Sequence, residues 1–92
     1  MYEIDYTRNF KKQVRKIIKS GRCPHAKIIK VIDALVSGSL LNPSLRNHKL
    51  NGEYLGMHEC HIRPDVLLIY EKDESESLIT LVAIGSHPEL FK

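Results

Sequence analysis

The sequence predicts an α+β domain in which an N-terminal strand and a hairpin of two helices precede a three-strand antiparallel meander. Three observations support this prediction. Apolar residues recur at helical spacing in residues 8–37, short apolar or alternating segments follow residue 53, and turn-forming residues separate these segments. Because helices and strands occupy different parts of the chain, we expect the helices to pack on one face of a four-stranded antiparallel sheet.

Length and composition fit a single domain, residues 1–92. The chain is 42% hydrophobic and 27% charged, which is typical of a soluble globular protein. It has no apolar run long enough to cross a membrane, and its first residues lack the apolar core of a signal peptide. Cys23 and Cys60 form no CxxC pattern and are interpreted as free thiols. We therefore expect a cytoplasmic protein without a membrane partner.

The first strand and helix are predicted from residues 2–20. Residues 2–6 alternate and are rich in strand formers. Thr7 can cap the helix that follows, in which Phe10 and Ile17 share one apolar face. Gly21 is placed to end this helix as its C-cap.

The second helix is predicted to start at Pro24 and to stop near Gly38. Proline suits the first turn of a helix because its missing N–H has no partner there in any case. The segment carries a broad apolar surface. Because only a short break separates the two helices, we expect an antiparallel helical hairpin.

The second half of the chain is predicted to form the meander. Residues 40–48 are interpreted as an ordered loop. Residues 54–62 form a strand in which Gly56 can produce a bulge. Residues 66–71 are nearly all apolar, as in a strand covered on both faces, and residues 78–84 form the last strand.

The charges of the chain are segregated. There is no acidic residue between Asp5 and Asp33, although the net charge of the whole chain is only +3. The first helix has a basic face opposite its apolar one, formed by Lys11, Lys12, Arg15, Lys16 and Lys19. This segregation predicts a polyanionic partner such as RNA, while a solvated charged surface is the simpler alternative.

Four of the five histidines lie in the second half of the chain. In the strand 54–62, Glu59 and His61 share one face because side chains alternate along a strand. His48 precedes this strand and His87 follows the last one, so a meander can bring them together. Cleavage of RNA through its 2′-OH needs a base, an acid and a positive group, and two imidazoles can carry both proton transfers without a metal.

Two runs of the sequence resemble a known family. "NHKLNGEYLGMHECHIRPDVLLIYEKD" and "IGSHPELF" are similar to the RelE/YafQ-type toxins of bacterial type II toxin–antitoxin systems, most closely to the YafQ branch. The resemblance is detailed over residues 46–91 and extends to residues 1–38 only in layout. It implies an endoribonuclease without a cofactor that cuts translated mRNA in the A site of the 70S ribosome. It also implies a cognate antitoxin, with a monomer when free and a higher assembly in the complex.

The resemblance also implies site residues. The positions that match catalytic ones in this branch are His48, His61, Asp65 and His87. We expect His87 to be the general acid and His48 the base, with the other two orienting the phosphate and the imidazoles. Phe91 matches an aromatic residue that stacks on a base, and Glu59 matches an acidic position sometimes counted with the site.

One position departs from the family pattern. Family members commonly carry an arginine four residues before the last histidine, where this chain has Ala83. The cation that would stabilise the phosphorane is therefore missing from its usual place. Each of three basic residues beside a matched histidine could replace it, namely Arg46, Lys49 and Arg63.

Three other functions stay open at the level of sequence. The four matched histidine and aspartate positions are metal-ligand types, although their spacing fits no closed zinc pattern. A toxin resembling the ParE type would inhibit DNA gyrase, but that type lacks the histidine set. A pure binding module would use its basic helix to dock on RNA or on an acidic antitoxin, and Ala83 keeps this alternative open.

Overall fold

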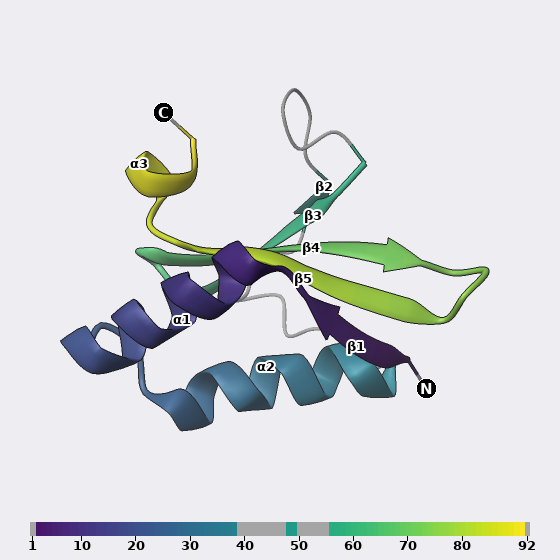
Figure 1. The fold of residues 1–92 in the computed structure, drawn as a ribbon, viewed down its shortest axis with the longest axis horizontal. Coiled ribbons are helices and arrows are strands. Elements are labelled where there is room, and N and C mark those ends of the chain that lie inside the picture. The colour runs from purple at the N-terminus through teal and green to yellow at the C-terminus, as the bar shows by residue number, and fades with distance from the viewer. Residues whose placement is uncertain (1, 39–47, 50–55, 92) are drawn as a thin grey trace.

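The computed structural model describes residues 2–38, 48–49 and 56–91. It confirms the predicted α+β class: within these residues one mixed sheet has the strand order β1-β5-β4-β3-β2 (Figure 1). Predictions that fall on residues 39–47 and 50–55 lie outside the described residues. They include Arg46, most of the expected loop and the first two residues of the strand expected at 54–62.

The predicted meander is present. It consists of β3 (His58–Arg63), β4 (Val66–Asp73) and β5 (Leu78–Gly85), and each consecutive pair is antiparallel. β4 is buried over its first five residues, as its apolar sequence predicts. The bulge expected at Gly56 is wrong, because Gly56 lies before β3 in a turn with φ of 86°. The irregularity in β3 comes instead near its end, between His61 and Arg63.

The first strand, β1 (Glu3–Tyr6), pairs with β5 in parallel, with Glu3 opposite Leu78 and Tyr6 opposite Leu81. The expectation of a wholly antiparallel sheet is therefore wrong at this edge. At the other edge a two-residue strand, β2 (His48–Lys49), pairs with β3. Its first residue falls in the segment expected to be a loop, so the described part of the sheet has four longer strands and this short one.

Both predicted helices form. α1 (Arg8–Ser20) begins at its cap Thr7, whose Oγ1 accepts a hydrogen bond of 3.1 Å from the Phe10 N–H. It ends at Gly21, which adopts the left-handed conformation with φ of 77°. α2 (His25–Ser37) follows, with Pro24 as its N-cap rather than within its first turn.

α1 and α2 cover one face of the sheet, and the main core lies between them and the strands (Figure 1). The helices contribute buried residues at helical spacing, and β3 and β4 contribute every second residue. In β5 this alternation is interrupted after Leu81 by a register shift against β4, so that Ile84 is the next core residue. Members of this core from both layers include Phe10, Ile17, Ile28, Val31, Cys60, Leu68, Tyr70, Ile79 and Leu81. Tyr70 is thus a core residue, and the His58 ring stacks on it with centroids 5.2 Å apart.

The start of α1 is attached to the open edge of β5. β1 pairs with β5 only as far as Leu81, so backbone groups beyond that point need other partners. Thr7 donates from its N–H to the Leu81 carbonyl at 3.0 Å and from its hydroxyl to the Val82 carbonyl at 2.7 Å. Gln13 Oε1 accepts from the Ile84 N–H at 3.0 Å. These bonds close the edge and fix α1 relative to the end of β5.

A third helix, α3 (His87–Leu90), lies on the opposite face of the sheet from α1 and α2 (Figure 1). It is capped by Ser86, whose side chain and N–H both bond to Glu89 in a capping box. The two helices of the predicted hairpin do share one face, and this third helix is an element that the sequence does not predict. No helix among the described residues is long and apolar enough to cross a membrane.

Candidate active site

The register of the sheet aligns the candidate residues across the face that α3 covers. His48 is paired with Glu59, Glu59 with Ile69, and Ile69 with Ala83. Paired residues in antiparallel strands have their side chains on the same side of the sheet. This row of paired residues therefore runs across β2, β3, β4 and β5 through the candidate site.

A second row runs beside the first and leads to the terminal helix. His61 is paired with Leu67, and Leu67 with Gly85. His87 follows Gly85 by two residues and is the first residue of α3. The register thus places His61 in one row with the strand end that leads into α3, and Leu67 of β4 lies between them.

Glu59 and His61 form the polar centre of this face. His61 Nε2 lies 3.0 Å from Glu59 Oε1. Glu59 is only 3% exposed, and the side chain of His61 is 15% exposed. The carboxylate is therefore buried although it lies outside the core under α1 and α2. A buried carboxylate in contact with an imidazole fixes the orientation and the tautomer of the ring.

The irregularity at the end of β3 turns Arg63 away from this pair. Arg63 is paired with Val66, which belongs to the core under α1 and α2, so its side chain starts on the helix-covered face. Its charge acts on the thiol of Cys23, and its Nε is buried with no hydrogen-bond partner among the described residues. The structure therefore does not bring Arg63 beside His61, as a replacement for the missing cation would require.

Asp65 lies in the turn between β3 and β4 and is exposed. Its charge acts on the buried Cys23, in the connection between α1 and α2. Burial is the main cause that raises the pKa of the Cys23 thiol, while Arg63 and Lys27 oppose the increase and Asp65 adds to it. Asp65 thus lies at the end of the β3–β4 hairpin rather than within the Glu59 row.

His87 is exposed at the start of α3, and its ring faces Phe91. The two ring centroids are 4.7 Å apart with an angle of 36° between the planes. The Phe91 N–H donates to the His87 carbonyl at 2.8 Å, which keeps the two residues on one helical turn. Phe91 is half-buried, so part of its ring is available for stacking on a nucleobase.

Ala83, where the family pattern predicts a cation, belongs to an apolar floor. It is 5% exposed and lies in a cluster with Leu67, Ile69 and Leu90. Partly buried residues that pack on this cluster are Met57, Val82 and Phe91. The position between the two candidate imidazoles is therefore filled by apolar side chains in the described part of the chain.

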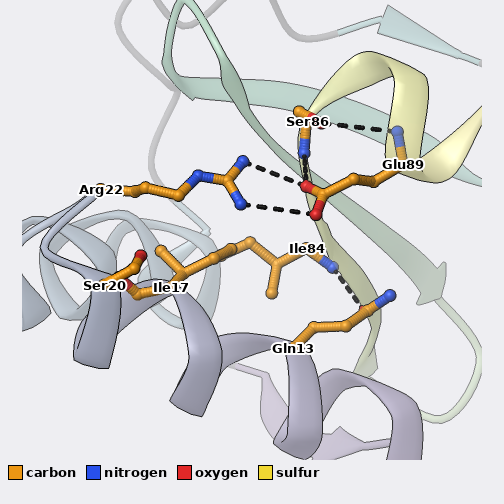
Figure 2. Close-up of polar contacts among 7 residues, drawn as sticks. All are labelled: Gln13, Ile17, Ser20, Arg22, Ile84, Ser86 and Glu89. Carbon is orange, nitrogen blue, oxygen red and sulfur yellow. Dashed lines mark hydrogen bonds and ion pairs between the residues drawn. The ribbon is translucent and has the colours of Figure 1, made fainter.

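α3 is anchored by an ion pair that sequence reasoning missed. Arg22 Nη2 lies 3.0 Å from Glu89 Oε1, and Arg22 Nη1 lies 3.5 Å from Glu89 Oε2 (Figure 2). Glu89 Oε1 also accepts from the Ser86 N–H at 2.7 Å. This backbone bond, followed by the Arg22 guanidinium, lowers the pKa of Glu89 to about 2. The Ser-x-x-Glu spacing of residues 86–89 is a sequence signal for a helix cap. No sequence pattern indicates that Arg22 contacts this cap.

The predicted basic face is present on α1. Its five cations are all exposed and lie opposite the buried Phe10 and Ile17. Near the end of the helix a surface pocket of about 450 Å³ is lined by Lys16, Lys19, Ser20, Arg22 and Glu89. The basic face therefore reaches the anchor of α3.

The described residues do not fit a metal centre. Where the chain is described, no group of three or more histidine, cysteine, aspartate or glutamate residues is close enough to hold an ion. Of the candidate residues whose side chains the structure describes, Glu59 and His61 are in contact, while Asp65 lies in the turn near Cys23. The side chains of His48 and Lys49 lie outside the described residues.

The described arrangement fits acid–base chemistry. One imidazole has a buried carboxylate as its partner, and a second is exposed on a short helix beside an aromatic ring. The apolar floor between them can support a base or a ribose, while the basic face offers contacts to phosphates.

Comparisons with known proteins agree with this geometry. Residues 2–92 match the model of a family described as bacterial toxin of type II toxin–antitoxin system, YafQ. The mRNA interferase toxin YafQ of Escherichia coli K12 is 27% identical over 90 residues, which cover 97% of this chain and 95% of that protein. A metal-bound toxin from Helicobacter pylori matches with a TM-score of 0.91 and 34% identity, over 99% of this chain and 100% of that chain. The E. coli DinJ–YafQ complex matches with a TM-score of 0.87 and 26% identity, over 100% of both chains.

Proposed function

Because the chain belongs to the YafQ family of bacterial type II toxin–antitoxin toxins, we propose that it is a ribosome-dependent endoribonuclease that cleaves mRNA in the A site. The observation that carries the proposal is the contact between Glu59 and His61 on the sheet face that also receives His87 and Phe91. A relative that covers this whole fold is named an mRNA interferase. Action on the ribosome would place the protein in the cytoplasm.

The proposed reaction is an attack of a ribose 2′-OH on the neighbouring phosphorus. A base removes the 2′-OH proton, the new P–O bond forms, and the bond from phosphorus to the 5′-oxygen breaks. An acid then protonates the leaving 5′-oxygen. The products are a 2′,3′-cyclic phosphate and a 5′-hydroxyl, so no outside reactant is consumed.

The site residues have separate roles in this proposal. His87 is the general acid, because it is exposed at the start of α3 where a leaving group can reach it. His48, which is paired with Glu59, is the base. His61 is oriented by Glu59 and contacts the phosphate, and Phe91 stacks on a base. Asp65 would orient an imidazole from the neighbouring turn, because its carboxylate repels a phosphate.

The cation that stabilises the phosphorane does not follow the family pattern in this chain. Ala83 is apolar and Arg63 starts on the helix-covered face. We propose that Lys49 or Arg46 supplies the positive charge, while the His61 ring donates a hydrogen bond to the phosphate. Cleavage by Arg46→Gln, Lys49→Gln and Arg63→Gln variants would rank the three cations, and we expect the smallest loss for Arg63→Gln.

The basic face of α1 would contact ribosomal RNA. Phosphate contacts of this kind position a protein on RNA without reading its sequence. The cations that would make these contacts are Lys11, Lys12, Arg15, Lys16 and Lys19. In this proposal the ribosome, held through these phosphate contacts, presents the mRNA to the candidate site.

The decisive experiment is cleavage of a defined mRNA during translation in vitro, followed by primer extension. We expect cuts at codon boundaries with the wild type, and a loss of about 100-fold or more with His87→Gln. His25→Gln is the matched control, because His25 is exposed at the start of α2, on the other side of the sheet. Equal cleavage by His87→Gln and His25→Gln would overturn the assignment of the acid.

The proposed route needs no metal because imidazoles carry both proton transfers. The toxin can be treated with a chelator and dialysed before it is added to ribosomes in their usual magnesium buffer. We expect undiminished cleavage after this treatment. A loss that is restored by one added transition metal would contradict the metal-independent route.

We propose a cognate antitoxin as the protein partner, with the toxin monomeric when free. A solved structure that matches this chain along its full length is a complex of YafQ with DinJ. Co-expression with the product of a small neighbouring acidic reading frame, followed by affinity purification and light scattering, tests this proposal. Recovery of the toxin alone from such a co-expression would count against that partner.

The alternative is a YafQ-like protein that binds RNA or antitoxin but cleaves weakly or not at all. Its supporting observation is the apolar floor at Ala83, where the family pattern has a cation. In the same translation assay, stalled ribosomes without cuts would favour this alternative. Damage that depends on DNA gyrase would instead favour a ParE-like activity.

A further inference from the structure

The terminal helix α3 depends on contacts with the rest of the protein for its position. A helix of four residues is far below the length that forms by itself. On one side Leu90 is 6% exposed and packs with Leu67 and Ile69. On the other side Glu89 contacts the connection between α1 and α2. The position of His87 therefore depends on both of these contacts.

The polar contact is made by two side chains that are far apart in sequence. The two terminal nitrogens of Arg22 face the two carboxylate oxygens of Glu89, at 3.0 and 3.5 Å (Figure 2). The oxygen nearer to Arg22 also accepts from the Ser86 N–H at 2.7 Å. Two-point contacts between a guanidinium and a carboxylate restrict the angle as well as the distance. The pair therefore fixes how α3 is rotated on the sheet.

Arg22 is itself held by its neighbours. Gly21 ends α1 in the left-handed conformation, and the Arg22 N–H donates to the Ile17 carbonyl at 3.2 Å. The next residue, Cys23, is 1% exposed in the core. The guanidinium thus extends from a well-packed turn and has a defined place relative to the sheet.

Glu89 also packs closely against the end of β5. A Cβ added at Gly85 would lie 3.1 Å from Glu89 Oε1 and 3.4 Å from Leu90 Cδ2. This close approach leaves little free volume between α3 and the strand. A shift of Glu89 is therefore transmitted to His87, two residues earlier on the same helical turn.

We propose that Arg22 is a positioning residue for the cleavage reaction: through Glu89 it holds α3 so that His87 and Phe91 face the scissile phosphate. This inference rests on the proposed endoribonuclease function. It assigns the connection between α1 and α2 a part in catalysis, although that connection lies on the other side of the sheet from the Glu59–His61 pair.

The test compares Arg22→Gln, Glu89→Gln and the double variant in the translation assay. Amide exchange of Leu90 and Phe91 is measured in parallel, because their N–H groups donate to Ser86 and His87 within α3. We expect each single variant to lower the cleavage rate at saturating ribosomes about tenfold and to speed this exchange about tenfold. The double variant should be no worse than either single one, because both substitutions remove the same ion pair.

Lys30→Gln is the matched control for removal of a positive charge, since Lys30 is exposed on α2. It should change neither the cleavage rate at saturation nor the exchange of α3. Arg22→Lys keeps the charge without the two-point geometry and should restore only part of the rate. Thermal unfolding of every variant shows whether it is folded at the assay temperature. If Arg22→Gln is unfolded there, the cleavage rate and amide exchange of Glu89→Gln decide the test.

A direct contact of Arg22 with RNA makes the opposite prediction. In that case Glu89→Gln would leave cleavage unchanged or improve it, and Arg22→Gln would raise KM rather than lower the rate at saturation. That result, or unchanged α3 exchange in both single variants, would overturn the inference. If the wild type does not cleave mRNA, the proposed function fails, and the exchange of α3 alone decides whether Arg22 positions this helix.

Discussion

Glu59 and His61, two residues apart on β3, form a 3.0 Å contact in which the carboxylate is buried and the imidazole is near the surface. Because the strand alternates, both side chains extend from the same face of the sheet. The acid is thus placed to hold the histidine rather than to meet a substrate itself. This relationship leads to the first prediction.

Replacing Glu59 by Gln should impair cleavage and leave the fold intact. The amide has nearly the same shape, but it no longer presents two equivalent acceptors to His61, so the ring loses its fixed tautomer. We expect cleavage to fall by at least about tenfold. Nitrogen NMR of the His61 ring, together with primer extension, measures both effects. The exposed Glu76→Gln is the control, and equal activity of the two variants would contradict the prediction.

The anchor of α3 should weaken in acid. The pKa of Glu89 is about 2 in the folded protein, below the value of about 4.3 for an unperturbed glutamate. A lowered carboxyl pKa stabilises the fold above the unfolded value, and this stabilisation is lost as the pH falls through the folded value. The difference in the free energy of unfolding between the wild type and Glu89→Gln should therefore shrink as the pH falls from about 4.5 to 2.

The side chain of Glu89 is 54% exposed, so solvent screens its charge. We therefore expect the wild type to exceed Glu89→Gln in free energy of unfolding at pH 7 by less than about 1 kcal/mol. Denaturant unfolding at pH 7 and pH 2 measures it. An advantage that grows toward low pH would show that another group is responsible.

Truncation in the core should cost far more than truncation on a helix surface. Leu68 is 0% exposed between the sheet and the helices, and Leu68→Ala should lower the free energy of unfolding by about 2–5 kcal/mol. Ile29 is 40% exposed on α2, so Ile29→Ala should change it by less than about 0.5 kcal/mol. Urea unfolding of both variants tests this contrast, which similar values would contradict.

The basic face of α1 should make RNA binding depend on salt. Removing one cation that binds a phosphate lowers the slope of log K against log salt by roughly 0.7–0.9. The double variant Lys12→Gln and Arg15→Gln should therefore flatten the slope by about 1.5, while cleavage at saturating ribosomes is kept. Filter binding to ribosomes at several salt concentrations measures it. Lys30→Gln on α2 should leave the slope unchanged, and an equal effect there would indicate non-specific attraction.

The parts of the fold that local sequence determines were predictable. Thr7 and Gly21 mark the ends of α1, and the apolar spacing of Phe10 and Ile17 marks its buried face. The alternation of β3 likewise placed Glu59 and His61 on one face. In each case the signal lies within a few residues of the structure that it predicts.

The missed features depend on partners that are distant in sequence. α3 is short enough that its Ser86–Glu89 cap alone does not imply a stable helix, and the ion pair that holds it comes from Arg22. The side to which Arg63 turns follows from its pairing with Val66, which a pattern of alternation does not reveal. The parallel pairing of β1 is a property of the assembled sheet. These are tertiary effects that override local patterns.

The pairing of β1 with β5 also sets the order in which this protein can fold. Among the described strands β1 comes first in the chain, and its hydrogen-bonded partner β5 comes last. Glu3 can therefore pair with Leu78 only after β5 has been synthesised. Contacts between such distant segments slow folding because a long loop must close before they form. The face that carries Glu59 is complete only when β5 has joined the sheet. The sheet face of the candidate site can therefore assemble only after β5 has been synthesised, and the strands made before it lack their β5 partner until then.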